Sequence, residues 1–137
     1  MEKEIRVLLV DDERPVLRSM EKTFLRAGFE VATAGNVTDG LALFQEALTS
    51  DQPFDIAVLD INMPDFEGKE SADAGLELLK KLLEAKPDLP VIMLTAFDAV
   101  SKAKTAIAAG ARDYFVKGRE AGLVELVQRT LTNTGGV

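Results

Sequence analysis

Residues 55–60, with the sequence DIAVLD, form a short run rich in Val, Ile and Leu that ends in an aspartate. The run lacks the apolar/polar alternation of a half-exposed strand. It therefore predicts a strand at Asp55–Leu59 that is buried on both faces, as in a parallel sheet covered by helices. Four similar runs predict further strands, at Ile5–Val10, Phe29–Ala34, Pro90–Leu94 and Tyr114–Val116.

Between these runs the apolar residues recur three or four positions apart, which is the spacing of one helix face. Five such stripes begin at Val16, Val37, Leu76, Ala99 and Leu123. Gly28 and Gly110 fit left-handed helix ends, and Pro87 marks another helix end. Five strand–helix units in succession predict an α/β domain, a doubly wound parallel sheet with helices on both faces.

Composition narrows the chemistry that the chain can perform. Its 137 residues fit one domain, and they include neither cysteine nor histidine. A site must therefore use carboxylates, hydroxyls, lysines and backbone groups, which favours a hard cation such as Mg²⁺. A net charge of −7 without a basic cluster in the sequence argues against direct nucleic-acid binding. No apolar run is long enough to span a membrane and no signal peptide is evident, so we expect a cytoplasmic protein.

Polar residues stand where the predicted strands end. The first strand leads into Asp11 and Asp12, the third into Asp60, the fourth into Thr95 and the fifth into Lys117. The carboxyl ends of parallel strands share one edge of the sheet, where open α/β folds bind ligands. With the strand order 2-1-3-4-5, the three aspartates meet where the strand order reverses.

Three neighbouring carboxylates repel one another unless a cation lies between them, and Mg²⁺ would fill that role. Lys117 supplies a point charge suited to a phosphate oxygen, and Thr95 supplies a hydroxyl donor. A carboxylate nucleophile, a metal, a lysine and a hydroxyl in one pocket predict a phosphoryl-transfer site.

Four segments of the chain also resemble the response-regulator receiver domains. They are VLLVDDE (7–13), VLDINMP (58–64), VIMLTA (91–96) and DYFVK (113–117). The resemblance extends from about Ile5 to Leu131. It implies a flavodoxin-like (βα)₅ fold with a receiver domain at residues 1–132, and residues 133–137 are expected to be a flexible tail or the start of a linker.

The resemblance assigns roles to the acidic residues and to one loop carbonyl. Asp60 matches the aspartate that accepts the phosphoryl group. Asp12 would bind Mg²⁺ directly and Asp11 would bind it through water. Asp60 and the backbone carbonyl of Asn62 would complete the metal site.

Three further residues take roles from the family. Thr95 matches the switch hydroxyl that bonds to the phosphoryl group, and Lys117 matches the lysine that pairs with it. Tyr114 matches the aromatic residue that turns inward when Thr95 moves. An aromatic residue on a strand is also common in a plain core, so that alternative stays open.

As a member of this family, the chain would receive a phosphoryl group from a sensor histidine kinase or from a small phosphodonor. It would catalyse only its own phosphorylation and dephosphorylation, and would not be an enzyme in the usual sense. The face formed by the fourth helix, fifth strand and fifth helix would engage an output domain or downstream protein, or form a homodimer.

Two departures from the family pattern stand out. Gly118 follows Lys117 where receivers commonly have a proline with a cis peptide bond, and we expect a trans bond here because a cis bond without proline is unfavourable. The segment 61–74, INMPDFEGKESADA, is about seven residues longer than the family's usual loop. Most of it is expected to be an exposed loop, with the charges of residues 65–73 in solvent.

The same residues permit other interpretations. Asp11 and Asp12 could cap a helix, Asp60 could be an ordinary loop acid, and Thr95 and Lys117 could be strand filler and a solvated strand end. A degenerate receiver would act as a phosphorylation-independent interaction module. A hydrolase of the haloacid dehalogenase type also attacks with an aspartate, but it carries a second acid where this chain has Asn62.

Overall fold

A computed structural model describes residues 4–64, 67–71, 73–96, 99–118 and 120–135. Its main sheet has five parallel strands in the order β2-β1-β3-β6-β7. The strands are β1 (Arg6–Val10), β2 (Glu30–Ala34), β3 (Ile56–Asp60), β6 (Val91–Thr95) and β7 (Asp113–Val116). The helices are α1 (Arg14–Arg26), α2 (Val37–Thr49), α3 (Ala74–Ala85), α4 (Val100–Ala108) and α5 (Glu120–Gly135).

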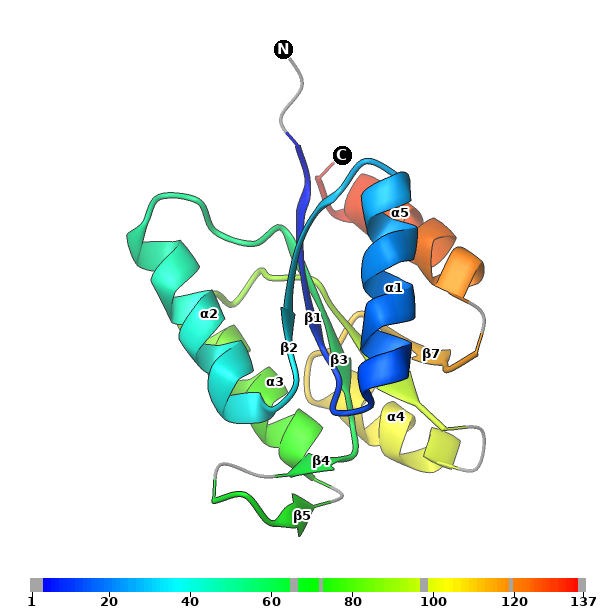
Figure 1. The fold of residues 1–137 in the computed structure, drawn as a ribbon. Coiled ribbons are helices and arrows are strands. Elements are labelled where there is room, and N and C mark those ends of the chain that lie inside the picture. Colours follow the sequence, from blue (N-terminus) through cyan, green and yellow to red (C-terminus); the bar gives the residue numbers. More distant parts are fainter. Residues whose placement is uncertain (1–3, 65–66, 72, 97–98, 119, 136–137) are drawn as a thin grey trace.

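Two hydrophobic cores lie on the two faces of this sheet. Side chains alternate along a strand, so Leu8 and Val10 of β1 join the core under α2, α3 and α4. Val7 and Leu9 join the opposite core, under α1 and α5. Figure 1 shows the helices in these two layers, with α1 and α5 on one side of the sheet and α2 and α3 on the other. The predicted doubly wound fold and strand order are confirmed.

The central strands are buried along their length, as their unbroken apolar sequences predict. β3 and β6 are buried at every residue, whereas the edge strands β2 and β7 are largely half-exposed because each has a neighbour on one side only. Asp60 and Thr95 are the last residues of β3 and β6, so regular strand structure holds their backbones.

The helix ends agree with the residues expected to form them. Gly28 and Gly110 adopt positive φ angles of 94° and 119°, which glycine tolerates better than other residues. Helix α3 stops at Ala85, shortly before Pro87. Helix α5 continues to Gly135, so helical backbone extends past residue 132, where the domain was expected to end.

The expectation of an exposed loop after Asp60 is wrong for part of that segment. Residues Met63–Pro64 (β4) pair with Glu70–Ser71 (β5) in an antiparallel hairpin. Ile61 and Met63 are buried in the core beneath α3, because apolar side chains beside a core are drawn into it.

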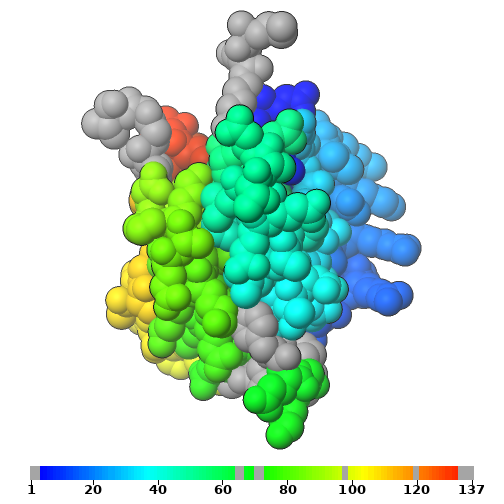
Figure 2. Space-filling view, turned by 90° about the vertical axis from the view of Figure 1, so that its left-hand side faces the viewer, coloured from blue at the N-terminus to red at the C-terminus, as the bar shows by residue number. Residues whose placement is uncertain are grey.

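The tip of this hairpin does reach solvent. Glu67 and Lys69 are exposed, in line with the expected solvated charges, whereas Asp65 and Phe66 lie outside the described residues. The hairpin extends beyond the carboxyl edge of the sheet (Figure 1), and its green segment protrudes from the molecular surface in Figure 2.

Gly75 allows α3 to dock directly on the backbone that follows β3. Its N–H donates to the carbonyl oxygen of Ile61 at 3.0 Å. A Cβ atom at Gly75 would lie 2.2 Å from the carbonyl oxygen of Asp60 and 2.7 Å from the Cα of Ile61. The close approach of helix and strand therefore requires a residue without a side chain.

Replacing Gly75 with alanine is expected to destabilise the protein by about 1–3 kcal/mol, because the new methyl group overlaps backbone atoms that cannot move independently. Chemical denaturation would measure this loss. The matched control is Gly35→Ala, where a Cβ would meet nothing within 4 Å. Equal stability of the two variants would contradict the proposed close packing.

Candidate functional site

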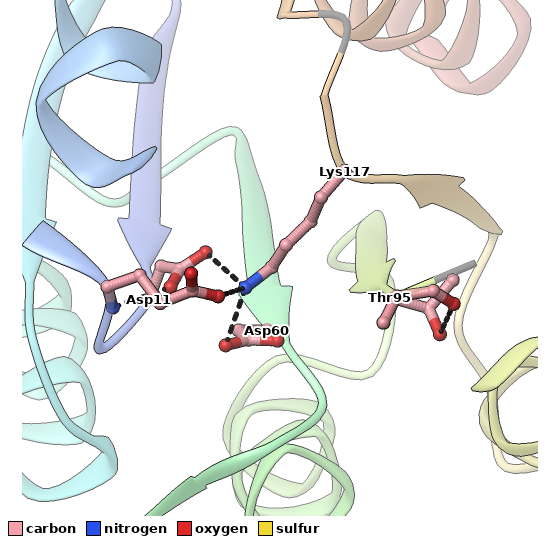
Figure 3. Close-up of polar contacts among 6 residues, drawn as sticks. Asp11, Asp60, Thr95 and Lys117 are labelled. Atoms are coloured by element: carbon pink, nitrogen blue, oxygen red, sulfur yellow. Dashed lines mark hydrogen bonds and ion pairs between the residues drawn. The ribbon is translucent and has the colours of Figure 1, made fainter. Parts of the chain in front are cut away.

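The strand pairing brings the acidic residues together at the carboxyl edge of the sheet. β1 and β3 are neighbours, with Val10 opposite Leu59. The residues that follow this pair, Asp11 and Asp60, therefore lie beside each other, and Figure 3 shows both directed at the ammonium group of Lys117. Asp11 is fully buried and Asp60 is 4% exposed.

Lys117 extends from the end of β7 into the middle of this acidic group. Its Nζ lies 3.0 Å from Asp60 Oδ2 and 3.0 Å from Asp11 Oδ2. It also lies 2.6 Å from Glu13 Oε1. One cation thus faces three carboxylates, so the group as a whole keeps an excess of negative charge.

Asp11 is fixed by the turn that leads into α1. The backbone N–H of Glu13 donates to its Oδ1 at 2.9 Å, which is a helix-entry contact of the kind expected from the capping alternative. Its Oδ2 is buried and has no hydrogen-bond donor among the described residues, because the Lys117 contact has the distance but not the geometry of a hydrogen bond. Asp11 therefore serves the turn with one oxygen and leaves the other for a cation.

Burial and charge crowding change the titration of all three central groups. Burial raises the pKa of Asp60 to about 7, the charge of Asp11 raises it too, and Lys117 opposes the rise. Burial likewise raises the pKa of Asp11. Burial alone would lower the pKa of Lys117, but its hydrogen bond to Glu13 and the charges of Asp60 and Asp11 raise it above the usual value.

Four carboxylates could share a metal ion at this edge. Asp11, Asp12, Glu13 and Asp60 each offer one oxygen, and these oxygens lie within 4.8 Å of one another. Clustered carboxylate oxygens suit Mg²⁺. The buried Asp11 Oδ2 has no hydrogen-bond donor among the described residues, and a metal ion or a metal-bound water could take the place of that donor. The residues present therefore fit the expected ion. Asn62 is exposed, and the role of its carbonyl stays a prediction.

Thr95 is close in the fold but its hydroxyl does not join the acidic group. The side chain is buried, and Oγ1 donates to the carbonyl oxygen of Ala99 at 3.0 Å, with a second contact of 3.2 Å to that of Ala96. In Figure 3 Thr95 stands apart from Asp60 and Lys117. Tyr114 is half-buried on β7 and packs against the core beneath α4. The structure thus assembles the carboxylates and the lysine, but not the hydroxyl or the aromatic ring.

Glu13 is the site residue that the sequence analysis does not single out. It makes the shortest contact to Lys117, although its side chain is 58% exposed. The sequence feature that could have identified Glu13 is its position directly after Asp11 and Asp12 at a strand end. A third acid there extends the acidic edge towards α1.

The peptide after Lys117 agrees with the expected trans geometry, since the described part of the chain contains no cis peptide bond. Gly118 has a φ of 118°, which residues with a side chain rarely adopt. Glycine is therefore suited to this turn in a way that a proline would not be.

The raised pKa of Asp60 predicts a stability change with pH in metal-free buffer. The folded state keeps a proton that the unfolded chain loses near pH 3.8, so the unfolding free energy falls as pH rises towards 7. Asp60→Asn removes the contribution of Asp60 to this fall, whereas Asp11, whose pKa is also raised, keeps its own contribution. The gain of the variant over the wild type should be on the order of 2–3 kcal/mol larger at pH 8 than at pH 5.

Urea unfolding at the two pH values, with a chelator present, checks this. The chain has no histidine, so few other groups titrate in this window. A gain that is the same at pH 5 and pH 8 would show that Asp60 titrates normally.

No helix in the described ranges is long and apolar enough to cross a bilayer.

Comparison with known proteins gives a direct match to a family. The model of the response regulator receiver domain matches residues 7–128. The probable transcriptional regulatory protein TcrX of Mycobacterium tuberculosis is 38% identical over 134 residues, which cover 97% of this chain and 52% of that protein.

A second relative is the photosynthetic apparatus regulatory protein RegA of Cereibacter sphaeroides, which is 33% identical over 86% of this chain and 58% of its own. This chain therefore spans about half the length of these curated relatives.

Solved structures agree with the sequence relatives. A CheY-like receiver domain protein from Methanospirillum hungatei has a TM-score of 0.81 and 28% identity, covering 96% of this chain and 97% of its own. The chemotaxis protein CheY4 of Vibrio cholerae has a TM-score of 0.79 and 29% identity, covering 93% and 99%. With the family model, the fold and the acidic edge in agreement, the chain belongs to the response regulator receiver domains of two-component signalling.

Proposed function

We propose that Asp60 is the phosphoacceptor of this receiver domain. The observation that supports this proposal is the position of the Asp60 carboxylate. It is nearly buried, lies 3.0 Å from the ammonium group of Lys117 and stands beside Asp11. An oxygen of Asp60 attacks phosphorus and forms a new O–P bond. The bond from phosphorus to the donor breaks, and its electron pair leaves with the donor, either the imidazole of a kinase phosphohistidine or the carboxylate of an acyl phosphate.

Asp60 attacks only in its ionised form, and burial works against ionisation. Lys117 opposes that penalty and is placed to pair with an oxygen of the incoming phosphoryl group. Asp11, Asp12 and Asp60, with the carbonyl of Asn62, would hold Mg²⁺, which neutralises the charge that gathers during transfer. Glu13 holds Lys117 at the mouth of the site until the phosphoryl group arrives.

Thr95 provides the proposed link from the site to the surface. Its hydroxyl bonds to Ala99, the residue immediately before α4. A phosphoryl group on Asp60 offers a stronger, charged acceptor, so the hydroxyl would turn towards it and release Ala99. Tyr114 would move inward into the space that Thr95 vacates. The start of α4 would then shift between two arrangements.

The partners follow from this switch. A sensor histidine kinase would supply the phosphoryl group, and the face formed by α4, β7 and α5 would engage an output domain, a downstream protein or a second copy of the chain. The curated relatives are longer than this chain. We propose no direct nucleic-acid contact by this domain. A reducing, cytoplasmic setting completes the proposal and agrees with the cysteine-free composition.

Membership of the receiver family leaves the hydrolase alternative without support. Nothing in the structure favours the degenerate-receiver alternative, and the contacts of Lys117 with Asp11 and Asp60 support the proposed phosphoacceptor site. The receiver would still release its own phosphoryl group to water with time, without acting on other substrates.

Incubation with acetyl phosphate and Mg²⁺ should add the mass of one phosphoryl group to the intact protein, measured by mass spectrometry. Asp60→Asn should abolish the gain, because an amide cannot form the O–P bond. Addition of EDTA should suppress it in the wild type.

The matched control is Asp88→Asn, which removes an exposed acid near the opposite end of β6 and should leave the gain intact. No gain in the wild type, alongside a receiver of known activity that reacts, would refute the proposed function. An equal gain in Asp60→Asn would place the phosphoryl group elsewhere.

A further inference from the structure

Glu13 combines a firmly held backbone with an exposed side chain. Its N–H donates to Asp11 Oδ1 at 2.9 Å, and its carbonyl oxygen accepts from the N–H of Leu17 at 2.9 Å. Its carboxylate nevertheless reaches the site, where Oε1 lies 2.6 Å from Lys117 Nζ, while the side chain is 58% exposed. The Glu13 side chain can therefore leave Lys117 for solvent without disturbing the backbone.

The position of the Lys117 ammonium group depends more on its charged partners than on packing. The backbone N–H of Lys117 donates to the carbonyl oxygen of Thr95 at 3.0 Å. The next residue, Gly118, has a positive φ and nothing within 4 Å of the place where a Cβ would stand. The lysine side chain also borders a small cavity, lined mainly by apolar residues of α1, β6, β7 and α5. The carboxylates around Nζ therefore decide where the ammonium group lies.

The three acids around Lys117 differ in their freedom to move. Asp11 and Asp60 are buried, and the sheet holds the backbone of both. Glu13 alone of the three is exposed. Lys117 donates hydrogen bonds to Glu13 and Asp60, whereas its contact with Asp11 is an ion pair without hydrogen-bond geometry. Figure 3 shows these contacts converging on Lys117 from separate elements. The most mobile of the three acids thus makes the shortest contact.

A phosphoryl group on Asp60 would change the demands on this ammonium group. It brings additional negative charge and strong acceptor oxygens within reach of Lys117. An ammonium group has three N–H donors, and one of them is directed at Glu13. A Glu13 carboxylate that shared the ammonium group with the phosphoryl group would also be close enough for the two negative charges to repel. Glu13 is therefore the partner that Lys117 would give up.

We propose that Glu13 restrains Lys117 in the unphosphorylated receiver and thereby opposes phosphorylation of Asp60; this inference rests on the proposed function of Asp60. The contact stabilises the unphosphorylated state only, so it must be broken as the O–P bond forms. Glu13 is thus a positioning residue that acts through Lys117 and does not touch the phosphoryl group. It lowers the fraction of receiver that a given amount of phosphodonor can phosphorylate.

Glu13→Gln tests the restraint because it removes the charge and keeps the size of the side chain. With acetyl phosphate and saturating Mg²⁺, we expect the rate constant for phosphorylation to rise about two- to fivefold, in line with the strength of exposed ion pairs. Decay of the phosphorylated protein after removal of the donor should stay unchanged, because the contact is already broken in that state. Mass spectrometry of the intact protein follows both rates. Glu13→Asp, which keeps the charge but shortens the side chain, should share the gain.

The matched control is Glu46→Gln, which makes the same change in net charge at an exposed position of α2. An equal gain in this control would show an effect of net charge alone and overturn the proposal. Slower phosphorylation of Glu13→Gln would also overturn it and would indicate that Glu13 helps to hold the metal ion. A gain in Glu13→Gln but not in Glu13→Asp would indicate repulsion of the anionic donor instead of a restraint on Lys117.

The outcomes for the two proposals can be told apart. Equal rates in the wild type and Glu13→Gln would refute the restraint alone. Failure of the wild type to react with acetyl phosphate would refute the proposed function of Asp60.

A second measurement does not depend on phosphorylation. Urea unfolding in metal-free buffer compares the effect of Glu13→Gln in the wild type with its effect in Lys117→Met. The substitution should be less favourable to stability when Lys117 is present, because only then is an ion pair lost. Equal effects in the two backgrounds would show that Glu13 and Lys117 are not coupled, which would overturn the proposal.

Discussion

The contact of Lys117 with Asp11, Asp60 and Glu13 is the constraint on which the site depends. The sheet order places β1 beside β3, so two aspartates meet where both are shielded from water. Isolated carboxylates in that position would take up protons. Lys117 reduces this tendency but does not remove it, because one ammonium group faces three acids. The remaining negative charge is what a metal ion and a transferring phosphoryl group would engage.

The rest of the fold holds these groups in place, and the proposed switch would act through one further element, α4. Gly75 lets α3 dock against the backbone of Asp60, which fixes the strand end that carries the carboxylate. Thr95 lies in the neighbouring strand, but its hydroxyl bonds to Ala99 before α4. The proposed switch begins when this hydroxyl exchanges a backbone acceptor for a charged one, and it continues in Tyr114 and the start of α4.

The sequence predicted the sheet and the acidic edge because both depend on local patterns. Unbroken apolar runs mark buried strands, and polar residues directly after them identify the edge on which Asp60 and Lys117 converge. The hairpin after Asp60 was not predicted, because its strands are short and the burial of Met63 depends on contacts with distant residues. The hydroxyl direction of Thr95 depends on a rotamer that no pattern encodes. The contact of Glu13 with Lys117 joins residues from opposite ends of the chain.

Burial and crowding, only partly offset by Lys117, set the ionisation of Asp60. Carbon-13 NMR of the aspartate side-chain carboxyl groups, followed against pH in metal-free buffer, measures this directly, with Asp60→Asn to assign the signal. We expect a midpoint for Asp60 at about pH 7, far above the ordinary 3.8. We also expect a higher midpoint in Lys117→Met, because the lysine lowers the pKa of Asp60. A midpoint near 3.8 in the wild type, or one unchanged by Lys117→Met, would contradict it.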